Sequence, residues 1–301
     1  MAEDDTKLLH DIFNRLGSVY PDLTKNATPF NNGNNGVVID HNDGTLSKFA
    51  FSYSSVEGAA AAREDFEYEW AMLKLMDGVT FDGIEVPRPI GEIQYLDQPG
   101  ADVFATYRMT KIDAQKLSVP FNEAACFYNM GRAMAQLHQG LAPLADAPAL
   151  RRWREHGDLI PQLPFMDEDT NKTLAKGNSY LTANAMTGVH HGDYHFKNMI
   201  FDAQGRVIGV VDPAFMSASD NILRDFKEIP LKHRASAISG YESVTGKKLD
   251  PLLVPLTDLS RVAWKMLITS KSDAAFLNPA HKPEFDRALK SVRDLLGFTP
   301  S

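Results

Sequence analysis

Residues 190–213 read HHGDYHFKNMIFDAQGRVIGVVDP, and this stretch decides which fold and which chemistry the chain is expected to have. Two short apolar runs flank a turn at 203–205, which predicts a β-hairpin. Asn198 begins the first strand and Asp212 follows the second, so the hairpin returns the two side chains to one place. Amide and carboxylate oxygens suit Mg²⁺, which keeps its other positions for water and phosphate. Asp193 is then left to orient and deprotonate an attacking hydroxyl, an arrangement typical of phosphoryl transfer.

The order of these residues resembles a known family of enzymes. His191-Gly192-Asp193, four further residues, Asn198 and an apolar strand ending at Asp212 are similar to the aminoglycoside phosphotransferase and choline kinase family of small-molecule kinases. The resemblance implies a protein-kinase-like fold that uses ATP and Mg²⁺. It also implies that Asp193 is the catalytic base and that Asn198 and Asp212 are the metal ligands.

Other residues around this motif have weaker expected roles. His191 is expected to hold the loop by hydrogen bonds, and Asp225 matches a family aspartate that braces the catalytic loop. Lys197 replaces the small residue that commonly precedes the family's asparagine, and it is either a phosphate contact or a solvated lysine. His190 and His195 are read as ordinary polar residues.

The periodicity of the remaining chain predicts an α+β fold with two lobes. The first part is β-rich with one long helix, and the second part is mainly helical. Expected helices are 4–16, 56–77, 121–139, 168–184 and at least three within 218–297; expected strands are 36–40, 46–51, 90–96, 102–109, 198–201 and 206–211. The predicted domains are a nucleotide-binding lobe at 1–109, a linker at 110–116 and a helical lobe with the catalytic loop and acceptor site at 117–301.

The first lobe contains candidates for binding a nucleotide. A loop with Gly33 and Gly36 leads into a strand, where backbone amides can approach phosphate. Lys48 lies on the partner strand, at the place where the family has its phosphate-binding lysine. The resemblance further implies a glutamate on the helix 56–77 that pairs with Lys48. Glu69 fits this pattern best, Glu67 is its rival, and Glu64 lies about a turn too early.

Adenine recognition rests on the resemblance alone. The segments 86–89 and 107–110 look like the family's strand-to-linker segment, and the linker would bind adenine through backbone groups of Thr110 and Ile112. Other nucleotide motifs fail. The stretch 240–248 has one residue too many between its glycines for a P-loop and lacks the Ser or Thr after lysine.

Composition limits the class of protein. Net charge is −8 and a single cysteine, Cys126, is present, which excludes a disulfide framework and a Cys-rich zinc site. The negative balance argues against nucleic acid as a partner. The first fifteen residues carry acids where a signal peptide needs positive charge, and the sequence has no apolar run long enough for a membrane span. A cytoplasmic location without membrane association is expected.

The sequence leaves the phosphate acceptor open. The half after residue 120 is nearly neutral, so an amino alcohol or a sugar fits no worse than an aminoglycoside-like antibiotic. The acidic run 167–169 is either an acceptor contact or a helix start. The basic run 151–154 is read as a solvated helix face rather than an anion contact. The alternative to a kinase is a nucleotide-binding regulatory protein, or a pseudokinase, without turnover.

Overall fold

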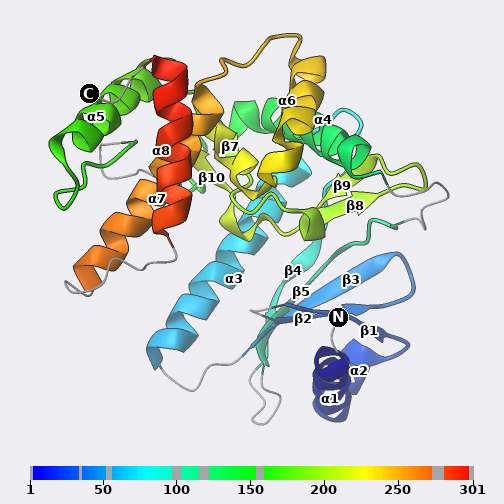
Figure 1. The fold of residues 1–301 in the computed structure, drawn as a ribbon. Coiled ribbons are helices and arrows are strands. Elements are labelled where there is room, and N and C mark those ends of the chain that lie inside the picture. Colours follow the sequence, from blue (N-terminus) through cyan, green and yellow to red (C-terminus); the bar gives the residue numbers. More distant parts are fainter. Residues whose placement is uncertain are drawn as a thin grey trace. The chain divides into compact units, whose positions relative to one another are not determined.

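The computed structural model describes residues 3–33, 36–51, 56–96, 103–114, 122–153, 159–272 and 281–297. The chain forms two compact units. Unit 1 consists of Met1–Pro120 and Lys197–Phe215, and unit 2 of Phe121–Phe196 and Met216–Ser301. Both are visible in Figure 1, where the colours follow the chain.

Unit 1 is built on a five-stranded antiparallel sheet in the order β1-β2-β3-β5-β4. The turn between β2 and β3 contains Asn42 and Gly44, both with positive φ, which is the conformation a tight hairpin requires. The strands are β1 (Thr28–Gly33), β2 (Gly36–Asp40), β3 (Thr45–Phe51), β4 (Pro89–Tyr95) and β5 (Val103–Thr110).

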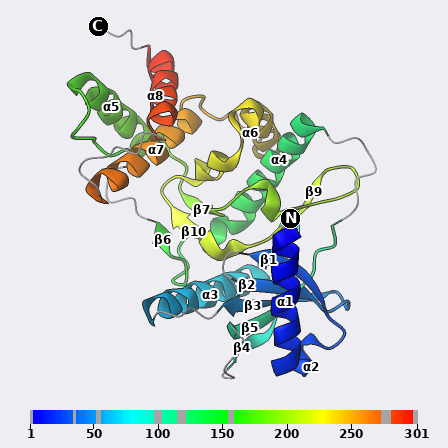
Figure 2. The ribbon, with the colours of Figure 1, turned by 60° about the horizontal axis from the view of Figure 1, so that its bottom comes forward.

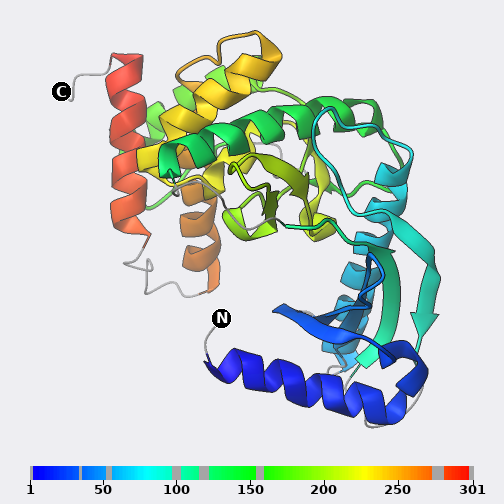
Figure 3. The same ribbon diagram turned by 90° about the vertical axis from the view of Figure 1, so that its right-hand side faces the viewer.

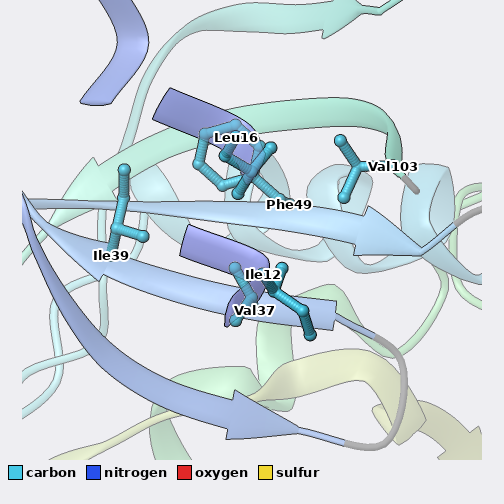
Figure 4. Close-up of a cluster of buried hydrophobic side chains, with 6 residues drawn as sticks. All are labelled: Ile12, Leu16, Val37, Ile39, Phe49 and Val103. Atoms are coloured by element: carbon cyan, nitrogen blue, oxygen red, sulfur yellow. The ribbon is translucent and has the colours of Figure 1, made fainter. Parts of the chain in front are cut away.

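One face of this sheet is covered by the amino-terminal helix α1 (Glu3–Val19) (Figure 3). Ile12 and Leu16 lie four residues apart on the helix and are both buried. They form one core cluster with Val37, Ile39, Phe49 and Val103, whose side chains are shown in Figure 4. The short helix α2 (Pro21–Thr24) follows directly.

Helix α3 (Val56–Asp77) packs against β3 and β4. Among its buried residues, Phe66, Glu69, Leu73 and Met76 recur every three or four positions, which is the spacing of one helical face. Phe66 and Trp70 lie on this face, and their rings contact that of Tyr107 with centroid separations of 4.9 and 5.1 Å. Because side chains alternate along a strand, Lys48 lies on the opposite face of β3 from Phe49.

A second hairpin, β8 (Met199–Phe201) and β9 (Val207–Val210), also belongs to unit 1. Glu85 forms a parallel bridge with Gly209, which ties the hairpin to the chain before β4. A Cβ atom at Gly209 would lie 3.0 Å from two side-chain carbons of Ile112. Glycine therefore allows Ile112 to pack closely on the hairpin.

Unit 2 consists mainly of helices around a small sheet. The helices are α4 (Glu123–Leu141), α5 (Glu168–Asn184), α6 (Leu231–Thr245), α7 (Leu253–Ser272) and α8 (Lys282–Leu296), with the short helices η1 (Ala142–Leu144) and η4 (Ile222–Glu228). The sheet has the order β6-β10-β7, formed by β6 (Arg152–Trp153), β10 (Ser217–Ser219) and β7 (Gly188–His190). Helices α7 and α8 lie side by side (Figure 2).

Helices α4 and α6 are held in contact by two glycines. A Cβ atom at Gly131 on α4 would lie 1.8 Å from the carbonyl oxygen of Ala237 on α6. A Cβ atom at Gly240 on α6 would lie 1.9 Å from the carbonyl oxygen of Tyr128 on α4. Neither position accepts any side chain, so the two backbones touch at both points.

Most predicted elements are present. Helices α3 and α5 and strand β2 have the predicted bounds. The acidic run begins α5, because the Asp167 carboxylate accepts a hydrogen bond from the Thr170 N–H and caps the helix. The predicted turn at 97–100 lies outside the described residues. No helix in the described part of the chain is long and apolar enough to cross a bilayer.

Two local predictions need correction. Residues 31–33 form the end of β1, and Gly33 lies opposite Gly36 across a hairpin, whereas a loop was expected before the strand. Residues 34–35 of that loop lie outside the described residues. Arg152 and Trp153 form strand β6 beside β10 and not a helix face, because the backbone pairs in parallel with Ala218 and Ser219.

Candidate active site

Lys48 and Glu69 form a buried ion pair within unit 1. The Lys48 Nζ lies 2.7 Å from both carboxylate oxygens of Glu69, and the two side chains are 15% and 7% exposed. The Tyr107 hydroxyl donates a third hydrogen bond, of 2.6 Å, to Glu69 Oε1. Glu67, the rival from the sequence, pairs with Arg63 on the helix surface and accepts a hydrogen bond from Tyr95. Lys48 thus pairs with Glu69.

The environment shifts the pKa of each partner. Burial alone would lower the pKa of Lys48, but the charges of Glu69 and Asp212 outweigh it and raise the pKa above its usual value. Burial raises the pKa of Glu69, and Lys48 opposes that rise only in part. Burial also raises the pKa of the Tyr107 hydroxyl, so this group stays protonated and donates. Lys48 therefore keeps its charge although it is largely removed from water.

Asp212 is the third member of this network. Its Oδ1 lies 3.5 Å from Lys48 Nζ, and its side chain is 41% exposed. The backbone of Asp212 has φ of +63°, in the left-handed region that residues other than glycine rarely adopt. The next three residues form η3 (Pro213–Phe215), which packs against α3. An aspartate held in a strained conformation beside a lysine is a feature that points to function.

Asn198 lies beside Asp212 in the β8–β9 hairpin. It ends η2 (Phe196–Asn198) and is buried. The Val211 N–H donates a 3.0 Å hydrogen bond to the Asn198 carbonyl, so the residue before Asp212 is paired with Asn198. The hairpin returns Asp212 to Asn198 at the backbone level, as the sequence predicts.

Asp193 belongs to unit 2. Its side chain is 31% exposed, and its Oδ2 lies 3.3 Å from His195 Nε2. The Asp193 N–H donates to His191 Nδ1 at 3.3 Å, so His191 does hold the loop. The buried Tyr194 hydroxyl donates to the Met130 carbonyl on α4 at 2.8 Å. The aspartate is accessible, while the residues around it are anchored.

Asp225 fixes the backbone before Asp193. Its two carboxylate oxygens accept the N–H groups of His191 and Gly192, both at 2.8 Å. His138 Nε2 lies 3.0 Å from the same carboxylate, and His138 Nδ1 lies 3.2 Å from the Tyr241 hydroxyl. Because a carboxylate only accepts, Nε2 carries the proton and Nδ1 accepts from tyrosine. Asp225 is therefore the structural brace that the sequence predicts.

The pKa of Asp225 agrees with this role. Full burial alone would raise it, but the hydrogen bond from His138 and the neighbouring His190 ring hold the pKa well below its usual range. Burial lowers the pKa of His190. His190 Nε2 lies 2.8 Å from the Ser217 hydroxyl, so the ring contacts the neighbouring strand β10. Asp225 thus stays ionised in the interior.

The other predicted nucleotide contacts have structural roles of their own. A Cβ atom at Gly36 would lie 2.1 Å from the Phe49 carbonyl oxygen, so the pairing of β2 with β3 by itself already requires glycine there. Thr110 is tied to Arg88, with its N–H donating to the Arg88 carbonyl and its hydroxyl accepting from the Arg88 N–H. Ile112 is buried. Lys197 is exposed.

Donor chemistry in unit 1 suits a hard divalent cation. Asn198 offers an amide oxygen and Asp212 a carboxylate, and Mg²⁺ is bound through one or two such groups plus phosphate oxygens. No group of three or more His, Cys, Asp or Glu side chains that could hold a metal occurs among the described residues. A two-ligand site of this kind needs no such cluster.

The sequence does not indicate the roles of three residues in the site: Tyr107, Tyr194 and His138. The periodicity of α4 contained a signal for His138, since it lies on the buried face with Met134 and Leu141. A histidine at an apolar helical position needs a buried partner. The two tyrosines act through hydroxyl groups whose partners are 38 and 64 residues distant in the sequence, which no local pattern indicates.

Comparison with known proteins identifies the family. Residues 56–222, more than half of the chain, match the sequence profile of the phosphotransferase enzyme family. The chain belongs to this family. The prediction that the protein is an enzyme of the kinase type is thereby confirmed. A comparison with curated protein sequences finds no match.

Solved structures with the same fold include several small-molecule kinases. The microcompartment-associated aminopropanol kinase is 15% identical, with a TM-score of 0.57 over 96% of this chain and 98% of that chain. Wild-type aminoglycoside 2'-phosphotransferase-IIIa in its GDP complex is 14% identical, with a TM-score of 0.51 over 96% and 99%. The amicoumacin kinase hAmiN, solved with AMP-PNP and Ca²⁺, is 14% identical, with a TM-score of 0.53 over 97% and 96%. These likenesses confirm the predicted kinase-like α+β fold.

Proposed function

We propose that this phosphotransferase moves the γ-phosphoryl group of ATP to a hydroxyl group of a small molecule. The observation that carries the proposal is the network of Lys48, Glu69 and Asp212 within unit 1. A charged lysine is buried there, held 2.7 Å from a glutamate and 3.5 Å from an aspartate. Burying such charges is costly, and structural ion pairs are often replaceable by apolar residues. A lysine fixed in this way is suited to orient nucleotide phosphates.

The proposed roles divide between the two units. Lys48, oriented by Glu69, binds nucleotide phosphate oxygens. Asn198 and Asp212 hold Mg²⁺, which supplies charge neutralisation at the phosphates when bound. Gly33 and Gly36 bring backbone close to phosphate, and Thr110 and Ile112 contact adenine through their backbones. Asp193 orients the acceptor.

The proposed reaction moves one proton and one phosphoryl group. The acceptor hydroxyl loses its proton to the Asp193 carboxylate as its oxygen forms a bond to the γ-phosphorus. The bond from that phosphorus to the bridging oxygen of ATP breaks, which leaves a phosphorylated alcohol and ADP. Asp225 and His191 keep the Asp193 backbone in place during the transfer.

The acceptor class is an aminoglycoside-like antibiotic, an amino alcohol or a sugar. Solved structures of the same fold include an aminopropanol kinase and an aminoglycoside phosphotransferase, and these two differ in acceptor. The complexes with GDP and AMP-PNP support a nucleotide as the donor. We propose one small hydroxyl compound as the partner, with neither nucleic acid nor membrane involved, and a cytoplasmic location.

The test is Mg²⁺-dependent ATP turnover against separate pools of aminoglycosides, amino alcohols and sugars. Wild type is measured beside Asp193→Asn, with Asp294→Asn as a matched control because Asp294 is 62% exposed on α8. We expect one pool to raise turnover by wild type and by the control and to leave Asp193→Asn flat. Tight MgATP binding by wild type with no product from any pool would instead favour a nucleotide-binding protein without turnover.

A further inference from the structure

Lys227 makes a short contact with the catalytic loop inside unit 2. Its Nζ donates a 2.7 Å hydrogen bond to the carbonyl oxygen of Gly192, the residue before Asp193. Lys227 lies at the end of η4, two residues after the brace Asp225. One short helix thus contributes both an anion and a cation to the same loop.

The two side chains of η4 bind the loop backbone in complementary ways. Asp225 accepts the N–H groups of His191 and Gly192, and Lys227 donates to the Gly192 carbonyl. Gly192 has φ of +83°, a conformation that is strained for residues with a Cβ atom. The peptide that joins Gly192 to Asp193 therefore has its carbonyl held by Lys227 and its N–H held by His191 Nδ1. Rotation of this peptide would redirect the Asp193 side chain.

Packing alone does not account for a lysine at this position. The side chain is 23% exposed, and burial lowers the pKa of its ammonium group. The Glu228 carboxylate is 3.8 Å away, farther than the Gly192 carbonyl, so the closest contact is the loop and not an ion pair. Lys227 also borders a small cavity of about 10 Å³, room for about one water molecule.

We propose that Lys227 is a positioning residue that fixes the Gly192–Asp193 peptide and so presents the Asp193 carboxylate in one orientation. The proposal rests on the proposed function, in which Asp193 accepts the proton of the acceptor. Lys227 acts through the loop backbone and touches neither substrate nor nucleotide in this role. A misplacement of the base by about 1 Å is enough to cost about 100-fold in rate.

The test compares Lys227→Met, which keeps an apolar stem and removes the donor, with Lys227→Arg, which restores a charged donor. Lys232→Met is the matched control, because Lys232 is 69% exposed on α6. We expect Lys227→Met to lower kcat by about 10- to 100-fold, with KM for MgATP within about twofold of wild type. Lys227→Arg should recover most of the loss, and Lys232→Met should behave as wild type.

A merely structural lysine would give a different pattern. It would lower the thermal midpoint and leave kcat per folded molecule unchanged well below that midpoint, and this result overturns the proposal. A rise in KM for MgATP with unchanged kcat also overturns it, since that places Lys227 in nucleotide binding.

A second measurement separates this proposal from the proposed function. Hydrogen exchange is followed in peptides that cover residues 190–196, in wild type and in the same variants. We expect faster exchange in Lys227→Met and not in Lys232→Met, whether or not an acceptor has been found. Unchanged exchange in Lys227→Met shows that the lysine does not hold the loop. If exchange is faster in Lys227→Met but the wild-type protein has no turnover, Lys227 does hold the loop, and the proposal that it serves catalysis is overturned.

Discussion

In unit 1 the candidate site is made of side chains that bind one another, whereas in unit 2 it is a backbone segment that other residues hold. Lys48, Glu69 and Asp212 form a chain of charges, in which the Lys48 side chain is 15% and the Glu69 side chain 7% exposed. Asp193 Oδ2 lies 3.3 Å from His195 Nε2, and the peptide groups before Asp193 are held by hydrogen bonds to Asp225 and His191. The difference suits the proposed tasks, since a phosphate-binding cation must be charged and fixed, whereas a base must be exposed and oriented.

In this comparison, the pKa shift of a buried carboxyl group has a different main cause in each unit. Burial raises the pKa of the Glu69 carboxyl, and the direct counter-charge of Lys48 opposes this rise. The carboxylate of Asp225 is buried as well, yet its pKa is held well below the usual range by hydrogen bonds. Substitutions in unit 1 should therefore act on nucleotide binding, and those in unit 2 on the chemical step.

The largest effect is expected from Asp193→Asn. Removal of a general base costs about 100- to 10,000-fold in rate, so kcat should fall by that factor. MgATP affinity should remain within about twofold, because the nucleotide contacts are proposed for unit 1. Steady-state turnover and titration with MgATP measure the two quantities. A large loss of MgATP affinity in this variant would contradict the proposal that unit 1 binds the nucleotide and unit 2 supplies the base.

The ion pair of unit 1 is tested by Lys48→Met, Glu69→Gln and the double variant. Breaking a buried pair by removing one partner costs about 3–5 kcal/mol in the free energy of unfolding, whereas removing both costs less than the sum. Denaturant unfolding completes this cycle. All three variants should raise KM for MgATP, because even the double variant that regains stability lacks the cation. Recovery of nucleotide binding in the double variant would show that the pair serves the fold alone.

The brace of unit 2 is tested by Asp225→Asn and by pH. A carboxyl whose pKa is lowered on folding stabilises the protein above its unfolded pKa, and this contribution is lost as pH falls through the lowered folded pKa. At pH 7 the variant should unfold with a free energy lower by about 3 kcal/mol. The difference should shrink at pH values below about 4, where carboxyl groups of the unfolded chain become protonated. Urea unfolding at pH 7 and at pH 3 measures it, and an equal difference at both would contradict the argument.

The smallest effects are expected from two matched tyrosine substitutions. Tyr107→Phe removes a hydrogen bond to the Glu69 carboxylate, and Tyr194→Phe removes one to the Met130 carbonyl. Each should cost about 1–2 kcal/mol of stability, the former slightly more because its acceptor is charged. Tyr107→Phe should raise KM for MgATP by a few-fold, and Tyr194→Phe should lower kcat by a few-fold. The reverse assignment in steady-state kinetics would overturn the comparison of the units.

Local patterns in the sequence were sufficient to predict most helices and strands and the site residues of unit 1. The apolar spacing of α3 and its end before Gly78 predicted its bounds, and Asn42-Asp43-Gly44 predicted a hairpin that the structure contains. Glu69 was preferred over Glu67 by resemblance, and the structure shows why only one is able to pair. Glu69 lies on the buried face of α3, while Glu67 is turned toward solvent and Arg63.

What the sequence could not reveal depends on contacts between distant residues. The segment 197–215 is joined to the rest of unit 1 by contacts such as the bridge between Glu85 and Gly209, which are more than one hundred residues apart. The contact of Lys227 with Gly192 spans 35 residues and joins the short helix η4 to a loop. A lysine near the end of a short helix has no pattern that separates it from a solvated one. The roles proposed for the site residues remain predictions for the experiments above.

Gly131 on α4 and Gly240 on α6 set the distance between these two helices, and both helices support the loop that contains Asp193. Helix α4 provides the Met130 carbonyl that anchors Tyr194 and the imidazole of His138, and α6 provides the Tyr241 hydroxyl that orients this imidazole. The separation of the helices is therefore transmitted through His138 to Asp225 and from there to the peptide before Asp193. A methyl group at Gly131 or Gly240 would lie 1.8 or 1.9 Å from a carbonyl oxygen of the facing helix and would push the two helices apart. In the proposed mechanism, the orientation of the Asp193 carboxylate thus depends on two positions that have no side chain.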